Sequence, residues 1–433
     1  MPSVAFHTLG CKVNQYDSQA MLELFEQAGY EVREFTQSAD VYVVNTCTVT
    51  GTGDKKSLNA VRRALRQNPA AQVVIAGCLA QRDGEKLLDT GARLVIGNAR
   101  RNEVVTLLEE AITKGQRVAA VSDILRVPYE PLAISRHEGH TRAVLKIQEG
   151  CDRYCTYCII PYVRGGIRSR RPQDVHAEAR RLADAGFTEL VLTGIHLTSY
   201  GRDLQHATLL DAVRACDMPG VQRIRLGSLE PVIVTEEFAD ALQKEAKVCP
   251  QFHLALQSGS DPVLRRMRRR YTTDDFRAAA ALLRQAFPGC ALTTDVITGF
   301  PGETEAEFDD TLSFCREIGF ARMHVFPYSA RQGTPAAHMP GQVPRAIREE
   351  RARRLIALGN ELALSYRAGQ VGSVVQVLTE EVADGVAHGY TAQYIPCDFP
   401  GGQPGRVDAV TVTGLTDEGL AGEKAEDNKA TIG

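Results

Sequence analysis

The sequence lacks the features that would place a protein in or beyond a membrane. No apolar run approaches the roughly 18 residues that a bilayer-spanning helix needs. The N-terminal stretch "MPSVAFHTLG" has no basic region followed by a long apolar core. We therefore expect no membrane span and no secretion signal, and we predict that the protein works in the cytoplasm.

The chain also lacks a strong overall charge. With 433 residues, 24% charged and 44% hydrophobic, it has the composition of an ordinary globular protein of several domains. The net charge of −3 means that a nucleic-acid partner would have to be held by a local basic patch. The charge is uneven, because residues 370–433 hold ten Asp/Glu and three Lys/Arg, a net −7, which leaves +4 for residues 1–369.

The first 125 residues alternate short apolar strands with helices. Helical spacing is clear in "YDSQAMLELFEQAG" and "KKSLNAVRRALRQNP". Short buried strands alternating with helices predict a parallel sheet covered on both faces, in a Rossmann-like domain over residues 1–125. The expected strands are "SVAFHTLG", "DVYVVNT", "QVVIAG" and "ARLVIG".

Residues 124–141 contain two prolines and no period, so they are predicted to be a linker. Six βα units then predict a partial (β/α)6 barrel over 137–367, whose site would lie at the carboxyl ends of the strands. A long helix is expected at 348–369, and glycine-separated strands in 368–433 indicate a small antiparallel β-barrel. The expected barrel strands are 142–148, 188–193, 221–227, 251–256, 291–298 and 321–327.

Three of the eleven cysteines, Cys151, Cys155 and Cys158, lie within "QEGCDRYCTYCIIP" at residues 148–161. In a reducing compartment such clusters are more often metal ligands than disulfides. Structural zinc usually takes four protein ligands, and histidine is absent from residues 141–175. A [4Fe–4S] cluster held by three thiolates would leave one iron open for a substrate.

Three other cysteines, Cys11, Cys47 and Cys78, each follow a predicted strand. The carboxyl ends of neighbouring parallel strands lie along one edge of a sheet, so these thiols could converge there. They could hold a second cluster with an open iron, or they could simply be small buried residues at strand ends.

At this point the sequence resembles a known family. C-x3-C-x2-C after the first barrel strand, with Tyr157 before the third cysteine, resembles the radical S-adenosylmethionine (SAM) superfamily. "HTLGCKVNQYDS", "NTCTVT", "LTGIH", "DVITGFPGET" and a C-terminal module like TRAM resemble the methylthiotransferases along nearly the whole chain. Among the branches, "HTLGCKVN" and "NTCTVT" resemble the MtaB type, which acts on N6-threonylcarbamoyladenosine at position 37 of tRNA, in the anticodon stem-loop.

The resemblance implies a chemistry and its cofactors. Two [4Fe–4S] clusters and SAM would be used, with Cys151, Cys155 and Cys158 holding the radical-generating cluster and the other triad holding the sulfur-carrying one. The radical would take hydrogen from C2 of the adenine, and a second SAM would supply the methyl group. An electron donor of the flavodoxin or ferredoxin type and a sulfur source are implied partners.

Alternatives stay open at this point. The same chemistry could act on N6-isopentenyladenosine 37 of tRNA or on an aspartate of a ribosomal protein. A non-enzyme alternative is an iron–sulfur redox or RNA-binding protein. "GFPGE" at 299–303 lacks the Lys-Ser/Thr of a phosphate-binding loop, so that interpretation is set aside.

By analogy with radical SAM barrels, residues at the ends of successive strands are candidates for contacting SAM, although each could have only a packing role. They are Thr193, Gly194, Glu230, Gln257, Asp295 and Phe326, together with Tyr157 of the cysteine loop.

Three features are candidates for contacting RNA, one of which is "VRGGIRSRR" at residues 163–171, close to the cysteine loop. "RRMRRR" follows the fourth barrel strand, and its arginines are predicted to contact phosphates: Arg265, Arg266, Arg268, Arg269 and Arg270. In the acidic tail, Tyr390, Tyr394 and Phe399 could stack on bases. We expect the arginines to supply most of the electrostatic attraction.

Overall fold

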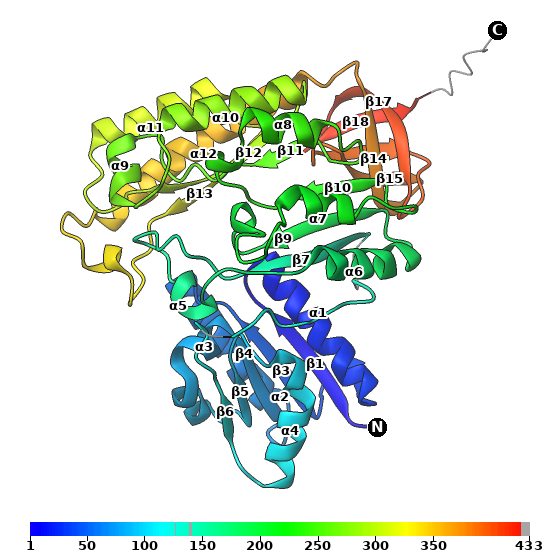
Figure 1. The fold of residues 1–433 in the computed structure, drawn as a ribbon, viewed down its shortest axis with the longest axis vertical. Coiled ribbons are helices and arrows are strands. Elements are labelled where there is room, and N and C mark those ends of the chain that lie inside the picture. The colour runs from blue at the N-terminus through cyan, green and yellow to red at the C-terminus, as the bar shows by residue number, and fades with distance from the viewer. Residues whose placement is uncertain (126, 138–140, 426–433) are drawn as a thin grey trace.

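The computed structural model describes residues 1–125, 127–137 and 141–425. Figure 1 shows three parts: an N-terminal domain at the bottom, a larger α/β region above it, and a small β-barrel at the upper right. In the described part of the chain, no helix combines the length and the apolar character that crossing a membrane requires.

The N-terminal domain is a six-stranded, all-parallel sheet with the order β2-β1-β3-β4-β5-β6. Its strands are β1 (Ser3–Thr8), β2 (Glu31–Arg33), β3 (Val41–Thr46), β4 (Gln72–Gly77), β5 (Leu94–Ile96) and β6 (Val118–Ala120). Its helices are α1 (Lys12–Gln27), α2 (Gly51–Gln67), α3 (Cys78–Asp83) and α4 (Val104–Thr113), with 3₁₀ turns at Gly84–Thr90 and Arg101–Glu103.

Alternation along the strands gives this sheet two apolar faces, because successive side chains point to opposite sides. On one face Tyr42 and Val44 pack with Val61 of α2. On the other face Val43 packs with Phe25 of α1 and with residues of α4. The predicted parallel sheet covered on both sides is confirmed.

The α/β region is a partial barrel whose six parallel strands follow chain order. The sheets β10-β9-β7-β8 and β11-β12-β13 are joined by parallel bridges from Ile224 to Val248 and from Leu229 to Leu254. The six parallel strands are β7 (Arg142–Glu149), β9 (Glu189–Gly194), β10 (Arg223–Leu226), β11 (Gln251–His253), β12 (Ala291–Thr298) and β13 (Arg322–Pro327). The two-residue β8 (Arg168–Ser169) pairs antiparallel with β7.

Helices follow the barrel strands and most of them cover the outer side of the barrel, whereas the short α5 lies against α3 of the N-terminal domain (Figure 1). They are α5 (Ile160–Arg164), α6 (Pro172–Asp184), α7 (Leu209–Ala215), α8 (Glu236–Gln243), α9 (Asp261–Arg266), α10 (Thr273–Ala286), α11 (Glu305–Ile318) and α12 (Arg345–Ala368), with 3₁₀ turns at Leu197–Ser199, Pro231–Ile233 and Pro335–His338. The expected long helix is therefore present as α12.

The predicted linker has no helix or strand in its described residues, yet it packs closely. Leu132 and Ile134 are buried in the core of the barrel region. Tyr16 of α1 donates its hydroxyl hydrogen to the Leu132 carbonyl at 2.8 Å, and Glu23 of α1 accepts from the Ser135 backbone N–H at 2.9 Å. The segment therefore fastens the N-terminal domain to the barrel. Residues 126 and 138–140 of the predicted linker lie outside the described residues.

The C-terminal part is a closed five-stranded barrel with the order β14-β15-β16-β18-β17. One part of the expectation was wrong: the barrel is not wholly antiparallel, because β16 pairs with β18 in parallel. The connection from β16 to β18 passes through β17, and this brings β18 back in the direction of β16. The strands are β14 (Val374–Ala383), β15 (Val386–Thr391), β16 (Pro396–Pro400), β17 (Val407–Leu415) and β18 (Leu420–Lys424).

Candidate active site

One edge of the N-terminal sheet carries Cys11, Cys47 and Cys78. The strands β1, β3 and β4 that precede them are neighbours, and Thr46 pairs in register with Gly77, so Cys47 and Cys78 leave the sheet side by side. Burial raises the pKa of Cys47 to about 11, and the thiols of Cys78 and Cys11 add to this shift. Cys47 and Cys78 therefore lie at the same sheet edge, and binding of one cluster by all three thiols stays a prediction.

Gly10 allows the backbones of this edge to approach closely. A Cβ atom at Gly10 would lie 3.0 Å from the Cβ of Cys47, and the φ of +107° disfavours any other residue. The side-chain amide of Asn14 donates to the Thr46 carbonyl at 3.0 Å and so holds the start of α1 against β3. Cys11, exposed at the start of α1, is thereby fixed beside Cys47.

The second cysteine set lies on the loop between β7 and α5. The backbone N–H of Cys151 donates to the Gly165 carbonyl, and that of Cys158 to the Cys155 carbonyl, each at 2.9 Å. Burial raises the pKa of Cys151 to about 11, and burial with the neighbouring Cys155 raises that of Cys158 to about 12. These thiols therefore release protons when they bind metal, as thiolate ligands must.

A buried ionic cluster stands beside this loop. Arg269 donates from Nη1 to the Cys155 sulfur at 3.2 Å, and its Nη2 lies 2.9 Å from Glu230 Oε1. The other Glu230 oxygen lies 2.9 Å from Arg153 Nε and 3.1 Å from His196 Nε2. Burial opposes ionisation of Glu230, but His196, Arg269 and Arg153 outweigh it and hold its pKa at about 2. Glu230 is therefore an anion that orients three cationic or polar groups around the cysteine loop.

Arg164 connects the two cysteine sets. It is fully buried, its Nε donates to the Cys78 sulfur at 3.2 Å, and its Nη1 donates to Glu149 Oε1 at 2.6 Å. Cys78 also packs against Ile159 and Val163, which directly follow the second set. The sheet edge with Cys78 therefore faces the loop with Cys158, and a single guanidinium contacts the thiol of one set and the strand that leads into the other.

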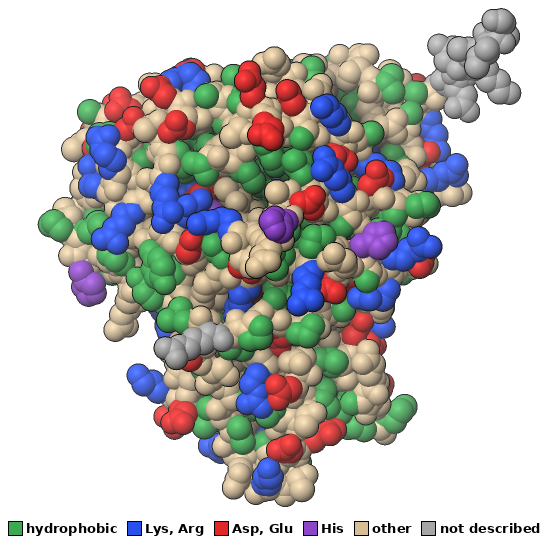
Figure 2. Space-filling model, in the orientation of Figure 1, with side chains coloured by type: hydrophobic (Ala, Val, Ile, Leu, Met, Phe, Trp, Pro, Cys, Tyr) green, Lys and Arg blue, Asp and Glu red, His purple; other side chains and the backbone are tan. Residues whose placement is uncertain are grey.

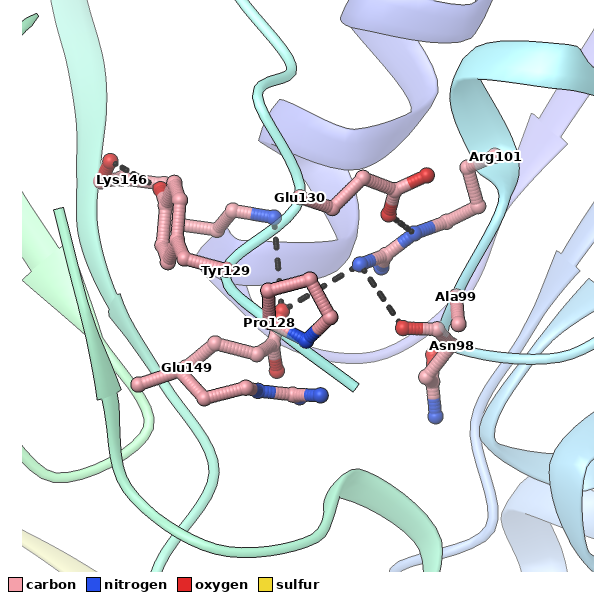
Figure 3. Close-up of a pocket in the computed structure, with 9 residues that line it drawn as sticks. Asn98, Ala99, Arg101, Pro128, Tyr129, Glu130, Lys146 and Glu149 are labelled. Atoms are coloured by element: carbon pink, nitrogen blue, oxygen red, sulfur yellow. Dashed lines mark hydrogen bonds and ion pairs between the residues drawn. The ribbon is translucent and has the colours of Figure 1, made fainter. Parts of the chain in front are cut away.

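Behind Arg164 lies a buried network of charges. Arg101 pairs with Glu130 at 2.8 Å and with Glu149 at 3.4 Å, and both Arg101 and Lys146 pair with Asp17. Figure 3 shows how Arg101, Glu130, Lys146 and Glu149 turn toward one another from the N-terminal domain, the linker and strand β7. The network joins three segments of the chain at the base of the site.

The residues proposed for SAM contact lie at or near the carboxyl ends of the barrel strands. Thr193 is buried, and a Cβ at Gly194 would lie 2.8 Å from the Cβ of Gln148 on β7, so only glycine fits there. Gln257 has a φ of +66°, a strained value for a residue with a side chain, and its N–H donates to the Asp295 carbonyl at 2.8 Å.

Of the remaining candidates, Asp295 pairs with His253 at 3.3 Å, and Phe326 is 50% exposed. Tyr157 packs edge-on against Phe300, with ring centroids 6.3 Å apart. The contacts of all these residues with SAM stay predictions.

The arginine run divides into two groups. Arg266 forms an ion pair with Glu307 at 2.7 Å, and Arg269 is only 7% exposed against Glu230 and Cys155. Arg265, Arg268 and Arg270 are exposed. Figure 2 shows Lys and Arg side chains gathered over the region of α9, on the left of the upper part of the molecule. The three exposed arginines are thus the members of the run that are available to phosphates.

Sequence reasoning missed Arg153, Arg164 and His196. Arg153 lies between the first two clustered cysteines, and His196 follows Gly194 in "LTGIH", so proximity to motif residues was a usable signal for both. Arg164 belongs to "VRGGIRSRR", which the sequence offers as an RNA contact, but it is fully buried and donates to the Cys78 sulfur instead.

The residues present fit iron–sulfur clusters. Arginine N–H groups point at the sulfurs of Cys78 and Cys155, as expected for thiolates whose charge must be balanced. Buried polar atoms without a hydrogen bond lie beside both cysteine sets. Asn98 Oδ1 lies near Cys78, and Glu230 Oε2 and Arg269 Nη2 lie near Cys155. The last two atoms are within ion-pair distance of charged neighbours.

Over residues 1–125, 127–137 and 141–425, no three His, Cys, Asp or Glu side chains are placed to hold one metal ion. This finding does not conflict with the fit, because in a [4Fe–4S] cluster each cysteine binds a different iron.

Comparison with known proteins agrees with this geometry. Residues 3–97 match an uncharacterized protein family, UPF0004, and residues 145–315 match the radical SAM superfamily. The threonylcarbamoyladenosine tRNA methylthiotransferase MtaB of Bacillus subtilis is 44% identical over 93% of this chain and 91% of its own length. The chain belongs to the MtaB-type radical SAM methylthiotransferases. It is therefore an enzyme, and its cofactors are SAM and two [4Fe–4S] clusters.

Other relatives include both branches of the family. MtaB of Thermotoga maritima is 35% identical over 98% of each chain. A tRNA-2-methylthio-N(6)-dimethylallyladenosine synthase of Parafrankia is 40% identical over 88% of this chain and 78% of its own length. Family membership excludes the non-enzyme alternative, an iron–sulfur redox or RNA-binding protein.

Solved structures share the fold. A radical SAM methyltransferase, TsrM from Kitasatospora setae with cobalamin and a [4Fe–4S] cluster bound, superposes with a TM-score of 0.57 at 15% identity, covering 90% of this chain and 81% of that chain. At this identity the likeness shows the fold alone.

Replacing Arg164 by lysine tests the contact between the two cysteine sets. Lysine keeps the charge, but it lacks the planar set of N–H groups with which Arg164 contacts the Cys78 sulfur and Glu149 at the same time. We expect methylthiolation to fall by roughly 10- to 100-fold, as for other residues that support a metal ligand. We also expect a shifted paramagnetic resonance spectrum of the reduced cluster that Cys78 is predicted to bind.

Arg82→Lys is the matched control for this experiment, because Arg82 lies on the same short helix as Cys78 and pairs with Asp54 at 2.8 Å. Equal spectra for the Arg164 and Arg82 variants would contradict a role for Arg164 at the cluster.

Proposed function

We propose that this methylthiotransferase adds a methylthio group to C2 of N6-threonylcarbamoyladenosine at position 37 of tRNA, in the anticodon stem-loop. The names of the MtaB relatives from Bacillus subtilis and Thermotoga maritima support this substrate. The observation that carries the proposal is the packing of Cys78 against Ile159 and Val163. It sets the sulfur-carrying edge against the radical-generating loop, as a transfer between them requires.

The C2–H bond of an adenine is too strong for acid–base chemistry at neutral pH, so the reaction depends on its cofactors. When bound, the cluster at Cys151, Cys155 and Cys158 supplies the electron that cleaves SAM, and the cluster at Cys11, Cys47 and Cys78 supplies the sulfur. The chain itself binds, orients and shields. Arg269 and Arg164 donate to the cysteine sulfurs, and the buried Glu230 holds Arg269 in place.

The substrate can be tested with anticodon stem-loop RNA. Anaerobically loaded enzyme is incubated with SAM, a reductant and RNA carrying either threonylcarbamoyladenosine or isopentenyladenosine at position 37. Mass spectrometry of the nucleosides should show the 2-methylthio product with the first RNA only. Product from the isopentenyl RNA alone, or from an aspartate of a ribosomal protein alone, would overturn the proposal in favour of one of the two alternative substrates.

We propose that tRNA phosphates bind to Arg265, Arg268 and Arg270, which are exposed. Arg269 and Arg266 are engaged within the protein and support the site rather than the RNA. Phe399 is 1% exposed, which argues against its stacking on a base, whereas Tyr390 and Tyr394 are partly accessible. The acidic C-terminal barrel can then contribute through these two tyrosines despite its net charge.

Replacing Arg265, Arg268 and Arg270 together by alanine should weaken tRNA binding and flatten its salt dependence. Each lost phosphate contact lowers the slope of log K against log salt by about 1, so a fall of roughly 2 to 3 is expected. Fluorescence anisotropy with labelled tRNA at several salt concentrations measures it.

The control triple variant, Arg66→Ala with Arg316→Ala and Arg353→Ala, removes the same charge from exposed positions elsewhere. An equal effect of both triple variants would show that only net charge matters and would contradict the proposed contacts.

The remaining partners follow from the proposed reaction. An electron donor of the flavodoxin or ferredoxin type would supply the electron to the cluster at Cys151, Cys155 and Cys158, and a separate sulfur source would replace the sulfur that is transferred. With tRNA as the substrate, the reaction takes place in the cytoplasm. We also propose that the domains run over residues 1–125, 137–367 and 368–433; residues 138–140 and 426–433 lie outside the described residues.

A further inference from the structure

The two nucleosides that this family modifies differ in charge. The threonylcarbamoyl group on N6 ends in a carboxylate, whereas an isopentenyl group is neutral and apolar. A site that accepts the charged group needs a cation without an internal partner, because an unpaired carboxylate in a secluded site is costly. The cation should lie on the same side of the base as the sulfur-carrying cluster, since C2 and C6, which carries N6, both flank N1 on one edge of the adenine ring.

Lys12 lies where such a cation is needed. It directly follows the cluster ligand Cys11 and is the first residue of α1, and its side chain is exposed. Its Nζ lies 6.0 Å from the ring centroid of Tyr394 in the C-terminal barrel. The guanidinium groups of Arg142, at the start of β7, and Arg225, on β10, each lie 4.8 Å from the centroid of the same ring. Lys12 therefore reaches from the sulfur-carrying edge into the barrel, toward the C-terminal part.

The neighbouring cations are already paired. Arg142 forms an ion pair with Glu380 at 2.6 Å, and Arg225 forms one with Glu189 at 2.8 Å. In the part of the chain that the structure describes, no carboxylate lies within ion-pair distance of Lys12. Among the described residues, Arg322 also has no carboxylate within ion-pair distance. It lies on β13, the edge strand at the far end of the partial barrel from β7, and it does not adjoin a cluster cysteine in the sequence.

Aromatic rings border the space beside Lys12. Tyr390 and Tyr394 stack on each other with centroids 4.9 Å apart, and the Arg142 guanidinium lies over both rings at 4.7 and 4.8 Å. The Arg225 guanidinium lies 4.8 Å from the Tyr394 ring. The stacked tyrosines therefore contact two arginines that have carboxylate partners, and in the described residues the Lys12 ammonium beside them has none.

On this basis, and resting on the proposed function, we propose that Lys12 determines substrate specificity by binding the carboxylate of the threonylcarbamoyl group. The ammonium donates hydrogen bonds to the carboxylate while C2 of the same adenine faces the sulfur-carrying cluster. An isopentenyl group offers no acceptor and would leave Lys12 unpaired, so the same residue favours one substrate and disfavours the other.

The test compares Lys12→Met, which keeps the length and removes the charge, with Lys12→Arg, which keeps the charge. Two anticodon stem-loop RNAs are used, identical except for threonylcarbamoyladenosine or plain adenosine at position 37, and dissociation constants are measured anaerobically. We expect Lys12→Met to weaken binding of the first RNA by roughly 10- to 100-fold, the range of a charge-assisted hydrogen bond, with Lys12→Arg restoring part of it. Binding of the second RNA should change less than about twofold.

Controls separate this contact from other causes. Lys86→Met removes an exposed charge elsewhere in the N-terminal domain and should leave both constants as in the wild type. Iron and sulfide content shows whether Cys11 still binds its cluster. Equal weakening for both RNAs would mean that Lys12 binds a phosphate, and no weakening would mean that it binds neither; each result overturns the proposal for Lys12 alone. A wild-type enzyme that forms no methylthio product from the first RNA would overturn the proposed function, and this proposal with it.

Discussion

Replacing Cys155 by alanine should abolish both the cleavage of SAM to 5′-deoxyadenosine and the formation of the methylthio product. The remaining two thiols of that loop cannot hold a cluster with one open iron, and Arg269 loses the sulfur to which it donates at 3.2 Å. The iron content should fall to about half, because the other cluster is held by a separate sheet edge. Iron analysis and chromatography of the nucleosides measure both effects.

Cys47→Ala provides the reciprocal experiment. It should also remove about half of the iron and abolish methylthiolation, but reductive cleavage of SAM should persist because the 151–158 loop is intact. Cys290→Ala is the control, since that buried thiol lies in the core and contacts the Leu283 carbonyl at 3.7 Å. Loss of SAM cleavage in the Cys47 variant, or its survival in the Cys155 variant, would contradict the assignment of the two sets.

The buried apolar strands could be predicted from the sequence, including the three-residue Leu94–Ile96, whereas partly exposed or irregular strands could not. Val41–Thr46 is buried throughout and reads clearly as a parallel strand. The strands Glu31–Arg33 and Val118–Ala120 at the sheet's two edges have three residues each and are partly exposed, so they carry too little pattern. Pro396–Pro400 begins and ends with proline, which normally argues against a strand.

The cysteine sets could be predicted because strand ends converge in any parallel sheet. The surroundings of the cysteines could not, because they depend on local backbone turns. In "RRMRRR" helix α9 ends at Arg266, and Arg268 takes a positive φ of 58° that reverses the chain. Arg269 is thereby turned inward to Cys155, whereas the run by itself indicates a solvated basic face. The turn at Arg268 therefore places Arg269 beside the cysteine loop.

The buried charge network gives the largest expected effect on stability. Replacing Arg101 by methionine should lower the free energy of unfolding by about 3–5 kcal/mol, because it removes one partner of a buried ionic group. Arg101 is 1% exposed, pairs with Asp17, Glu130 and Glu149, and donates to the Asn98 carbonyl at 3.1 Å. Figure 3 shows Arg101 of the N-terminal domain facing Glu130 of the linker and Glu149 of strand β7. Urea-induced unfolding of the cluster-loaded enzyme measures the change.

Lys114→Met is the matched control, because its ion pair with Glu110 at 3.1 Å is exposed and should contribute less than about 1 kcal/mol. Since Arg101 joins the N-terminal domain to the linker through Glu130, its loss should also loosen the contact between the parts. Proteolysis should then cleave near residues 127–137 sooner than in the control variant. Equal unfolding free energies for the two variants would contradict this prediction. They would mean that Lys146 and Arg164 neutralise Asp17 and Glu149 without Arg101. Arg101 would then not be needed to hold the two cysteine sets together.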